Sequence, residues 1–156
     1  MNRPTFQPSN LPTPGRLLAV DWGERRIGLA LSDETQTLAQ PLATLTRRAG
    51  KRFPMAQLLD LVKRHGVTGI IVGLPLDESG AEGDAAHAAR ALADDIKRRL
   101  GDVEVTMWDE RMTTARVLAA VREMGGSTRG RKADLDAMAA ALLLQHYMDA
   151  RKGTAL

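Results

Sequence analysis

Two short apolar runs joined by a polar turn constrain the fold of this chain more than any other feature. The first run, residues 17–22, is mostly apolar, which is typical of a strand buried on both faces. Gly23 interrupts it, and a second apolar run follows at residues 27–32. Strands separated by so short a polar segment are expected to pair as an antiparallel hairpin.

The rest of the chain alternates between helical and extended patterns. We expect strands at 39–46, 67–72 and 103–108, and helices at 53–65, 84–100 and 133–150. A further helix should begin near Thr113 or Thr114 and end at Gly125. Pro41 makes the strand at 39–46 irregular or an edge strand. This order predicts an α/β fold, in which a mixed five-stranded sheet starts with the antiparallel hairpin, continues with parallel strands and carries helices on both faces.

The length of 156 residues, 44% of them hydrophobic, fits one domain with a single core. We place it at residues 16–150, after a flexible N-terminal tail at 1–15 that is rich in proline, and before a C-terminal tail at 151–156. No segment approaches the roughly 18 consecutive apolar residues of a membrane span, and no secretory signal is recognisable. We therefore expect a cytoplasmic protein with no membrane partner.

Polar breaks end several of the predicted strands. Asp21 ends the first strand, Gly73 follows the run at 67–72, and Asp109 and Glu110 follow the run at 103–108. Ligands gather beyond the carboxyl ends of strands in sheets of this kind. The breaks therefore predict a functional site at one edge of the sheet.

Asp21 and Glu110 are the candidate site residues on the strands. An acid in an apolar strand is costly to bury unless it is paired or binds a cation, although Asp21 could instead accept backbone N–H groups from the turn at Gly23. Glu110 could equally make local salt bridges within the Asp109–Glu110–Arg111 cluster. Because side chains alternate along a strand, we expect only one of Asp109 and Glu110 to reach the site.

The third candidate, Asp136, lies in the last predicted helix, which is apolar nearly all round and therefore buried. Asp136 shares a helical face with Ala140 and Leu143, so it is expected to point inward. Asp134 is an alternative acid, but it is also a good helix N-cap.

The three acids could converge on a cation, and their oxygens suit Mg²⁺ or Mn²⁺, which prefer oxygen ligands. Two such ions can clamp the attacking water and the leaving oxygen of a phosphodiester during in-line displacement. The chain has no cysteine, which excludes thiol catalysis and Cys-based zinc or iron–sulfur sites. The formal net charge of +3 permits a polyanionic partner.

Four short motifs in order along the chain resemble those of the YqgF family, whose members are described as Holliday junction resolvases or pre-16S ribosomal RNA nucleases. The motifs are Asp21-Trp22-Gly23-Glu24-Arg25-Arg26-Ile27-Gly28, Gly73-Leu74-Pro75-Leu76 with Gly80 and Gly83, Asp109-Glu110-Arg111-Met112-Thr113-Thr114, and Lys132 with Asp136-Ala137-Met138-Ala139-Ala140. The resemblance covers residues 16–147. One departure is Asp77, where the family commonly has Asn.

The resemblance implies a ribonuclease H-like fold related to the RuvC resolvases. It implies Asp21, Glu110 and Asp136 as the catalytic and metal-binding acids. It also implies a nuclease that matures the 5′ end of 16S ribosomal RNA. The substrate alternative within that activity is branched DNA, whose symmetric resolution needs a two-fold dimer; the sequence leaves monomer or homodimer open. A non-catalytic nucleic-acid-binding module is the alternative of another class.

Basic residues near these acids are candidate phosphate contacts. Arg129, Arg131 and Lys132 lie just before Asp136 in a loop with glycines and could bind the phosphate backbone or form an ordinary solvated charge run. Arg26 could contact phosphate or hold the strand-end carboxylates in place. The glycines at 80 and 83 could present backbone N–H groups to phosphate or simply form a loop.

Overall fold

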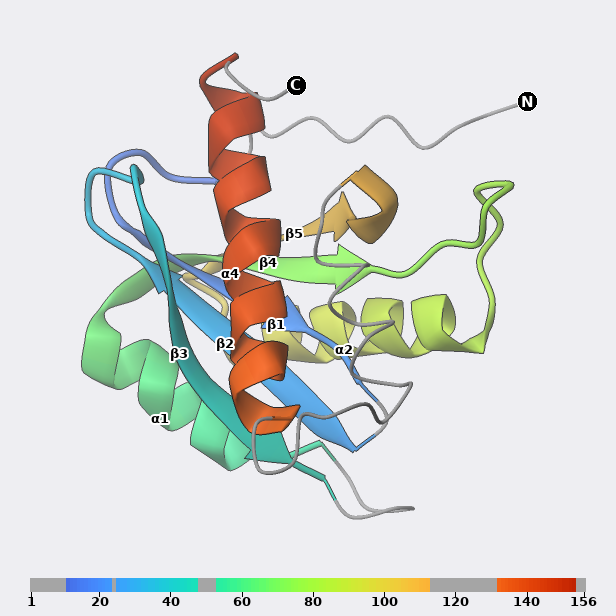
Figure 1. The fold of residues 1–156 in the computed structure, drawn as a ribbon. Helices are drawn as coiled ribbons and strands as arrows, with labels where there is room; N and C mark the ends of the chain where they lie inside the picture. The colour runs from blue at the N-terminus through green and yellow to red at the C-terminus, as the bar shows by residue number, and fades with distance from the viewer. Residues whose placement is uncertain (1–10, 24, 48–52, 113–131, 154–156) are drawn as a thin grey trace.

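The computed structural model describes residues 11–23, 25–47, 53–112 and 132–153 (Figure 1). Its strands are β1 (Arg16–Asp21), β2 (Arg26–Ser32), β3 (Ala39–Thr46), β4 (Val67–Leu74) and β5 (Glu104–Asp109). Its helices are α1 (Met55–His65), α2 (Asp84–Arg99), the single turn η1 (Glu110–Met112) and α4 (Lys132–Arg151). These bounds lie within two residues of the predicted ones. The helix expected from Thr113 or Thr114 lies outside the described residues.

The sheet is mixed, as predicted, and β1 is its central strand. The strand order is β3-β2-β1-β4-β5. The pairs β1–β2 and β2–β3 are antiparallel, whereas β1–β4 and β4–β5 are parallel. β3 is an edge strand, and its register against β2 shifts between Leu29 and Ala30, opposite Pro41. A proline has no N–H to donate to the ladder, which explains both its edge position and the irregularity.

Helices cover both faces of the sheet (Figure 1), as the alternation of the sequence predicts. Leu18 and Val20 of β1 point to the core shared with α1 and α2. Leu17 and Ala19, which alternate with them, pack in a second core together with α4. The apolar character of α4 follows from this position, because the helix lies across the sheet with most of its surface covered. Since α4 begins at Lys132, Asp134 lies inside its first turn and not at the N-cap we expected.

Residues 11–15, which we placed in the tail, pack against the domain. Leu11 is buried within the α4 core. The Gln36 amide donates to the carbonyl oxygens of Pro12 (2.6 Å) and Gly15 (2.9 Å). Arg151, at the end of α4, donates to the Gln36 side-chain oxygen (3.0 Å) and to the Leu11 carbonyl oxygen. These contacts join the segment before β1 to the C-terminal end of α4.

Within the described ranges, no helix is both long enough and apolar enough to cross a bilayer.

Candidate active site

Buried acids lie at the carboxyl end of the parallel strands, where the sequence predicts a site. Asp21 is 2% exposed at the end of β1, and Glu110 is 9% exposed at the start of η1. Asp136, in the second turn of α4, is fully buried, as expected from the face it shares with Ala140 and Leu143. Burying acids at one edge of a sheet is costly, so this edge carries the strongest indication of function in the described structure.

Two glycines place the three acids relative to one another. Asp21 pairs with Gly28 of β2, and Val20 pairs with Val72 of β4, so Gly73 lies beside Asp21 on the other neighbouring strand. A side chain at Gly28 would overlap the carbonyl oxygen of Asp136, which shows that the start of α4 lies directly on β2. A side chain at Gly73 would overlap the carboxylate of Glu110.

The three acids therefore lie at one level of the sheet, Asp21 within β1, Glu110 over β4 and Asp136 over β2. Alternation along β1 directs Asp21 to the face that Leu17 and Ala19 present to α4. Glu110 lies over β4 on that face, where Gly73 also approaches Leu143 of α4. Adjacent strands are about 4.8 Å apart, so Asp21 lies between Glu110, which is over β4, and the backbone of Asp136, which is over β2, although the three residues are far apart in the sequence.

Arg26 binds one of these acids directly. Its Nε donates to Oδ2 of Asp136 at 2.7 Å, and the Arg26 side chain is 29% exposed. The ion pair compensates the buried charge of Asp136 and joins the start of β2 to the start of α4. The sequence left two roles open for Arg26, and this contact supports the structural one, in which Arg26 holds a carboxylate in place. Binding of phosphate by the exposed part of the guanidinium remains a proposal.

The three acids do not form a ready metal cluster in this arrangement. Among the described residues, no three His, Asp or Glu side chains lie close enough together to hold one ion. In this arrangement, Oδ2 of Asp136 is bound to the Arg26 guanidinium. Each acid nevertheless has a buried oxygen, Oδ2 of Asp21, Oε1 of Glu110 and Oδ1 of Asp136. This all-oxygen set on one face fits the ligand preference of Mg²⁺ and Mn²⁺.

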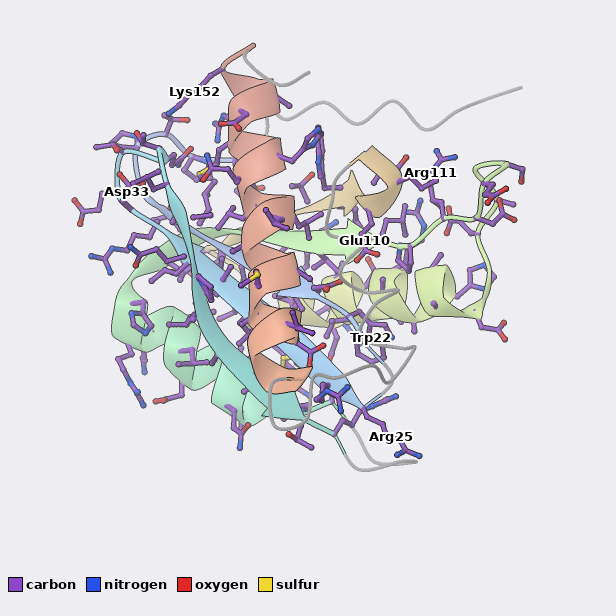
Figure 2. All side chains as sticks on the ribbon, viewed as in Figure 1. Trp22, Arg25, Asp33, Glu110, Arg111 and Lys152 are labelled. Carbon is purple, nitrogen blue, oxygen red and sulfur yellow. The ribbon has the colours of Figure 1, made fainter. Side chains whose placement is uncertain are left out.

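Asp109 does not join the three acids. Strand alternation turns it to the opposite face, where it accepts hydrogen bonds from the backbone N–H (2.9 Å) and from Nη2 (2.8 Å) of Arg111. Hydrogen bonding to Asp109 raises the pKa of Arg111, so the guanidinium stays charged. Arg111 also donates to the carbonyl oxygen of Asp77 (3.3 Å), and thereby joins η1 to the loop after β4. Figure 2 shows Arg111 beside that loop and Glu110 nearer the sheet.

The loop after β4 is organised by Asp77. Its Oδ1 accepts hydrogen bonds from the N–H (2.9 Å) and hydroxyl (2.6 Å) of Ser79 and from the N–H of Ala81 (2.9 Å). These bonds, chiefly the one from the Ser79 hydroxyl, lower the pKa of the Asp77 carboxyl. A single oxygen accepts all three bonds, so an asparagine amide could build the same turn. The N–H of Gly80 donates to the Asp77 carbonyl oxygen (3.0 Å), so this group is used within the loop rather than turned toward a phosphate.

Several predicted site residues cannot be placed. Arg129 and Arg131 lie outside the described residues, as do the side chains of Lys132 and Asp134. Their proposed contacts with phosphate stay predictions.

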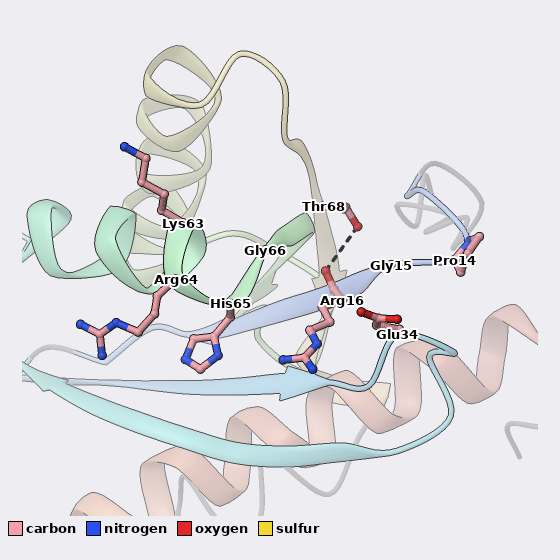
Figure 3. A pocket seen from close by; sticks show the side chains of 9 residues that line it. All are labelled: Pro14, Gly15, Arg16, Glu34, Lys63, Arg64, His65, Gly66 and Thr68. Atoms are coloured by element: carbon pink, nitrogen blue, oxygen red, sulfur yellow. Dashed lines mark hydrogen bonds between the residues drawn. The ribbon is translucent and has the colours of Figure 1, made fainter.

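A cavity of about 580 Å³ lies away from the acids, at the end of the sheet where β1 begins (Figure 3). Its lining consists of Pro14, Gly15, Arg16, Glu34, Lys63, Arg64, His65, Gly66 and Thr68. The basic side chains in the last turn of α1 stabilise the negative end of that helix's dipole. Their position is thus explained without a ligand.

Sequence reasoning missed the close approaches at Gly28 and Gly73 and the contacts of Arg111. The sequence did carry a signal for the two close approaches, because a glycine inside an apolar strand often marks a site where another backbone comes close. The contacts of Arg111 with the loop after β4 join segments that are distant in the sequence, and no local pattern encodes them.

Comparisons with known proteins agree with this architecture. The family model described as "RuvX: Holliday junction resolvase" matches residues 15–150. A protein of Acetivibrio thermocellus named "Putative pre-16S rRNA nuclease" is 36% identical over 87% of this chain and 96% of its own length. A protein of the same name from Paramagnetospirillum magneticum is 38% identical over 94% of each chain.

Solved structures show the same fold at low sequence identity. RuvC of T. thermophilus, in a complex with a Holliday junction substrate, has a TM-score of 0.53 and 19% identity over 90% of this chain and 98% of that chain. The yeast mitochondrial Holliday junction resolvase has a TM-score of 0.51 and 14% identity over 94% of this chain and 82% of that chain. The fold is therefore the RuvC-like, ribonuclease H-like one that the motifs imply. Together with the family match over residues 15–150, this shows that the chain belongs to the RuvX family, also called YqgF.

Proposed function

We propose that this chain is a metal-dependent nuclease that hydrolyses phosphodiester bonds in RNA, and that it acts on the 5′ end of precursor 16S ribosomal RNA. One observation carries the proposal: Asp21, at the end of β1, lies on one face of the sheet at the level where Glu110 covers Gly73 of β4 and Asp136 covers Gly28 of β2. The names of the curated relatives support the choice of RNA. Such a substrate would place the protein in the cytoplasm.

The roles of the residues follow from their positions. Asp21, Glu110 and Asp136 would supply the carboxylate oxygens that hold Mg²⁺ or Mn²⁺. When bound, such ions acidify the attacking water and stabilise the leaving oxygen. Asp21 is fixed by the central strand and Glu110 by the turn after β5, whereas Asp136 is oriented by Arg26. Arg26, Arg129, Arg131 and Lys132 would bind flanking phosphates.

The test is cleavage of end-labelled RNA and DNA of matched sequence with Mg²⁺, Mn²⁺ or a chelator. We expect metal-dependent cleavage of RNA and a loss of about a thousandfold or more in Asp136→Asn, since metal stabilisation is worth several kcal/mol. Asp149→Asn, at the other end of the same helix, is the matched control and should keep full activity. Cleavage in the presence of chelator, or full activity of Asp136→Asn, would contradict the proposal.

A second candidate is resolution of branched DNA. It is favoured by the description of the matching family model and by the RuvC-like fold. Resolving a four-way junction symmetrically needs a two-fold dimer, whereas a monomer suffices for RNA cleavage. Cleavage of junction and RNA substrates is compared side by side, and the molecular mass of the protein is measured in solution. Together these measurements distinguish junction resolution from RNA cleavage. Binding of either substrate without metal-dependent cleavage would instead indicate a non-catalytic binding module.

A further inference from the structure

An aromatic and basic cluster lies at the same end of β1 as the acids, and the proposed chemistry does not use it. It consists of Trp22, Arg47 and Phe53, and we call it the Trp22 cluster. Phe53 stacks on Trp22 with 5.8 Å between ring centroids and 17° between planes. The guanidinium carbon of Arg47 lies 4.8 Å from the centre of the Trp22 ring. Each of the three side chains is partly exposed.

The position of the cluster brings it to the edge of the candidate site. Trp22 directly follows Asp21 in the chain. The backbone N–H of Arg47 donates to the carbonyl oxygen of Arg25 at 2.6 Å, which joins the end of β3 to the segment before β2. Arg26, the next residue, binds Asp136. Figure 2 shows Trp22 and Arg25 at the same end of the sheet as Glu110.

Packing explains only part of this arrangement. Trp22 and Phe53 pack against the core shared by α1 and α2, so they help to close that core. Closing a core does not require a cationic side chain, yet the Arg47 guanidinium lies over Trp22 and the Arg47 backbone is bonded to that of the exposed Arg25. Arg26 is paired with Asp136, whereas the exposed Arg25 adds a positive charge at the surface that attracts a polyanion. Aromatic rings beside guanidinium groups are what proteins use to bind unpaired bases and the phosphates between them.

We propose that the Trp22 cluster binds a nucleobase of the substrate strand, one or two nucleotides away from the phosphate held at the acids. The base stacks on the part of the Trp22 ring that Phe53 and Arg47 leave exposed, and Arg25 contacts a neighbouring phosphate. A base in a duplex is already stacked and paired, so the bound segment is unpaired at this point. The inference rests on the proposed function for the nature of the ligand, but it needs no cleavage.

The experiment uses the tryptophan content of the chain. There are two tryptophans, and the other, Trp108, is buried and hydrogen-bonded to His146. In a Trp108→Phe variant the fluorescence comes from Trp22 alone, and a stacked base quenches it. We expect saturable quenching by a short oligoadenylate in the presence of chelator, and much weaker quenching by a duplex of the same length. Trp22→Phe, which keeps Trp108, should show no quenching.

Affinity provides the second measurement, by anisotropy of labelled RNA. Trp22→Leu should weaken binding about tenfold to a hundredfold, the usual effect of removing one stacking side chain. Trp22→Phe should retain most of the affinity, because the ring face remains. Arg47→Met should weaken binding more than Arg47→Lys, which keeps the charge. Thermal melting checks that each variant is folded. If Trp22→Leu does not fold, the quenching experiment still tests the inference, because it does not use that variant.

The outcomes separate this inference from the proposed function. RNA binding without quenching, with the same affinity in Trp22→Leu and wild type, would overturn the inference and leave the nuclease proposal standing. Quenching and binding without metal-dependent cleavage would support the inference and contradict the nuclease proposal. Tighter binding and stronger quenching by duplex than by the single strand would also overturn it. If no RNA or DNA binds at all, both proposals fail.

Discussion

The two ends of the central strand β1 bury polar side chains in opposite ways. Where β1 begins, the buried polar residues are neutral. Ser32 accepts a hydrogen bond from the N–H of Leu17 (2.8 Å), and Gln36 bonds to two backbone carbonyls and to Arg151. Where β1 ends, the buried polar residues are acids: Asp21, Glu110 and Asp136 on the α4 face, and Asp109 on the opposite face.

The first arrangement stabilises the fold, because a buried polar group with its hydrogen bonds made avoids the cost of desolvation. The second buries acidic side chains, which costs free energy of folding through desolvation, offset at Asp136 by its ion pair with Arg26. Proteins tolerate such arrangements where function requires them. Stability and activity should therefore respond separately to changes at the two ends.

The largest effect is expected from Asp21→Asn. Cleavage of RNA should fall about a thousandfold, because the central carboxylate oxygen is replaced by an amide that binds Mg²⁺ poorly. The free energy of unfolding should change little, since the substitution keeps the size and shape of the side chain and removes the cost of burying a charged group. Single-turnover cleavage and urea denaturation measure the two quantities. A large loss of stability in this variant would break the comparison.

Next in size is the effect of Gly28→Ala. The added methyl group overlaps the backbone of Asp136, and backbone cannot rotate away as a side chain can. We expect the free energy of unfolding to fall by about 3 kcal/mol, the upper end for overpacked positions. Gly101→Ala, where a methyl group would meet nothing within 4 Å, is the matched control. Equal stability of the two variants in urea denaturation would show that α4 does not lie on β2 as closely as described.

At the other end, Gln36→Leu should lower the free energy of unfolding by about 2 kcal/mol. It removes the partner of two backbone carbonyls and of Arg151, and buried groups left unsatisfied cost about 1–3 kcal/mol. Cleavage per folded molecule should stay unchanged, measured at a temperature well below the melting point. Loss of activity in the folded variant would mean that the two ends are coupled through α4.

The smallest effect concerns pH. Burial lowers the pKa of His146 below its usual value of 6.5, against a smaller raising effect of Asp149. The unfolded chain therefore takes up a proton first as the pH falls below about 6.5, and the free energy of unfolding decreases until the pH reaches the lower folded pKa. Above pH 6.5 the contribution is fully present. Urea denaturation between about pH 7 and pH 5 should show this slope, and His146→Gln should reduce it.

Most of the fold could be predicted from local patterns. The apolar runs at 17–22 and 27–32 predicted the hairpin, and the nearly continuous apolar surface of residues 137–144 predicted a buried helix. These features depend on residues close in the sequence, for which periodicity is a sufficient signal. The tail was predicted less well, because Leu11 is a single apolar residue among prolines and only its contact with α4 reveals its role.

The burial of the candidate acids could be predicted from the sequence, but their mutual geometry could not. Strand ends and a helical face pointed to Asp21, Glu110 and Asp136, and the structure buries all three. That Arg26 binds Asp136, and that the three carboxylates do not converge on a single position, depends on side-chain orientations across distant segments. Sequence patterns carry no information on such orientations.

The place of α4 in the chain has a consequence for biosynthesis. Asp136 lies on a helix that follows all five strands, so it can cover the sheet only after every strand has been made. A nascent chain that has emerged as far as η1 carries Asp21 and Glu110 but neither the third acid nor the helix that encloses them. With the proposed nuclease activity, such a chain cannot cut RNA beside the ribosome that makes it, and it becomes competent only after α4 has been translated.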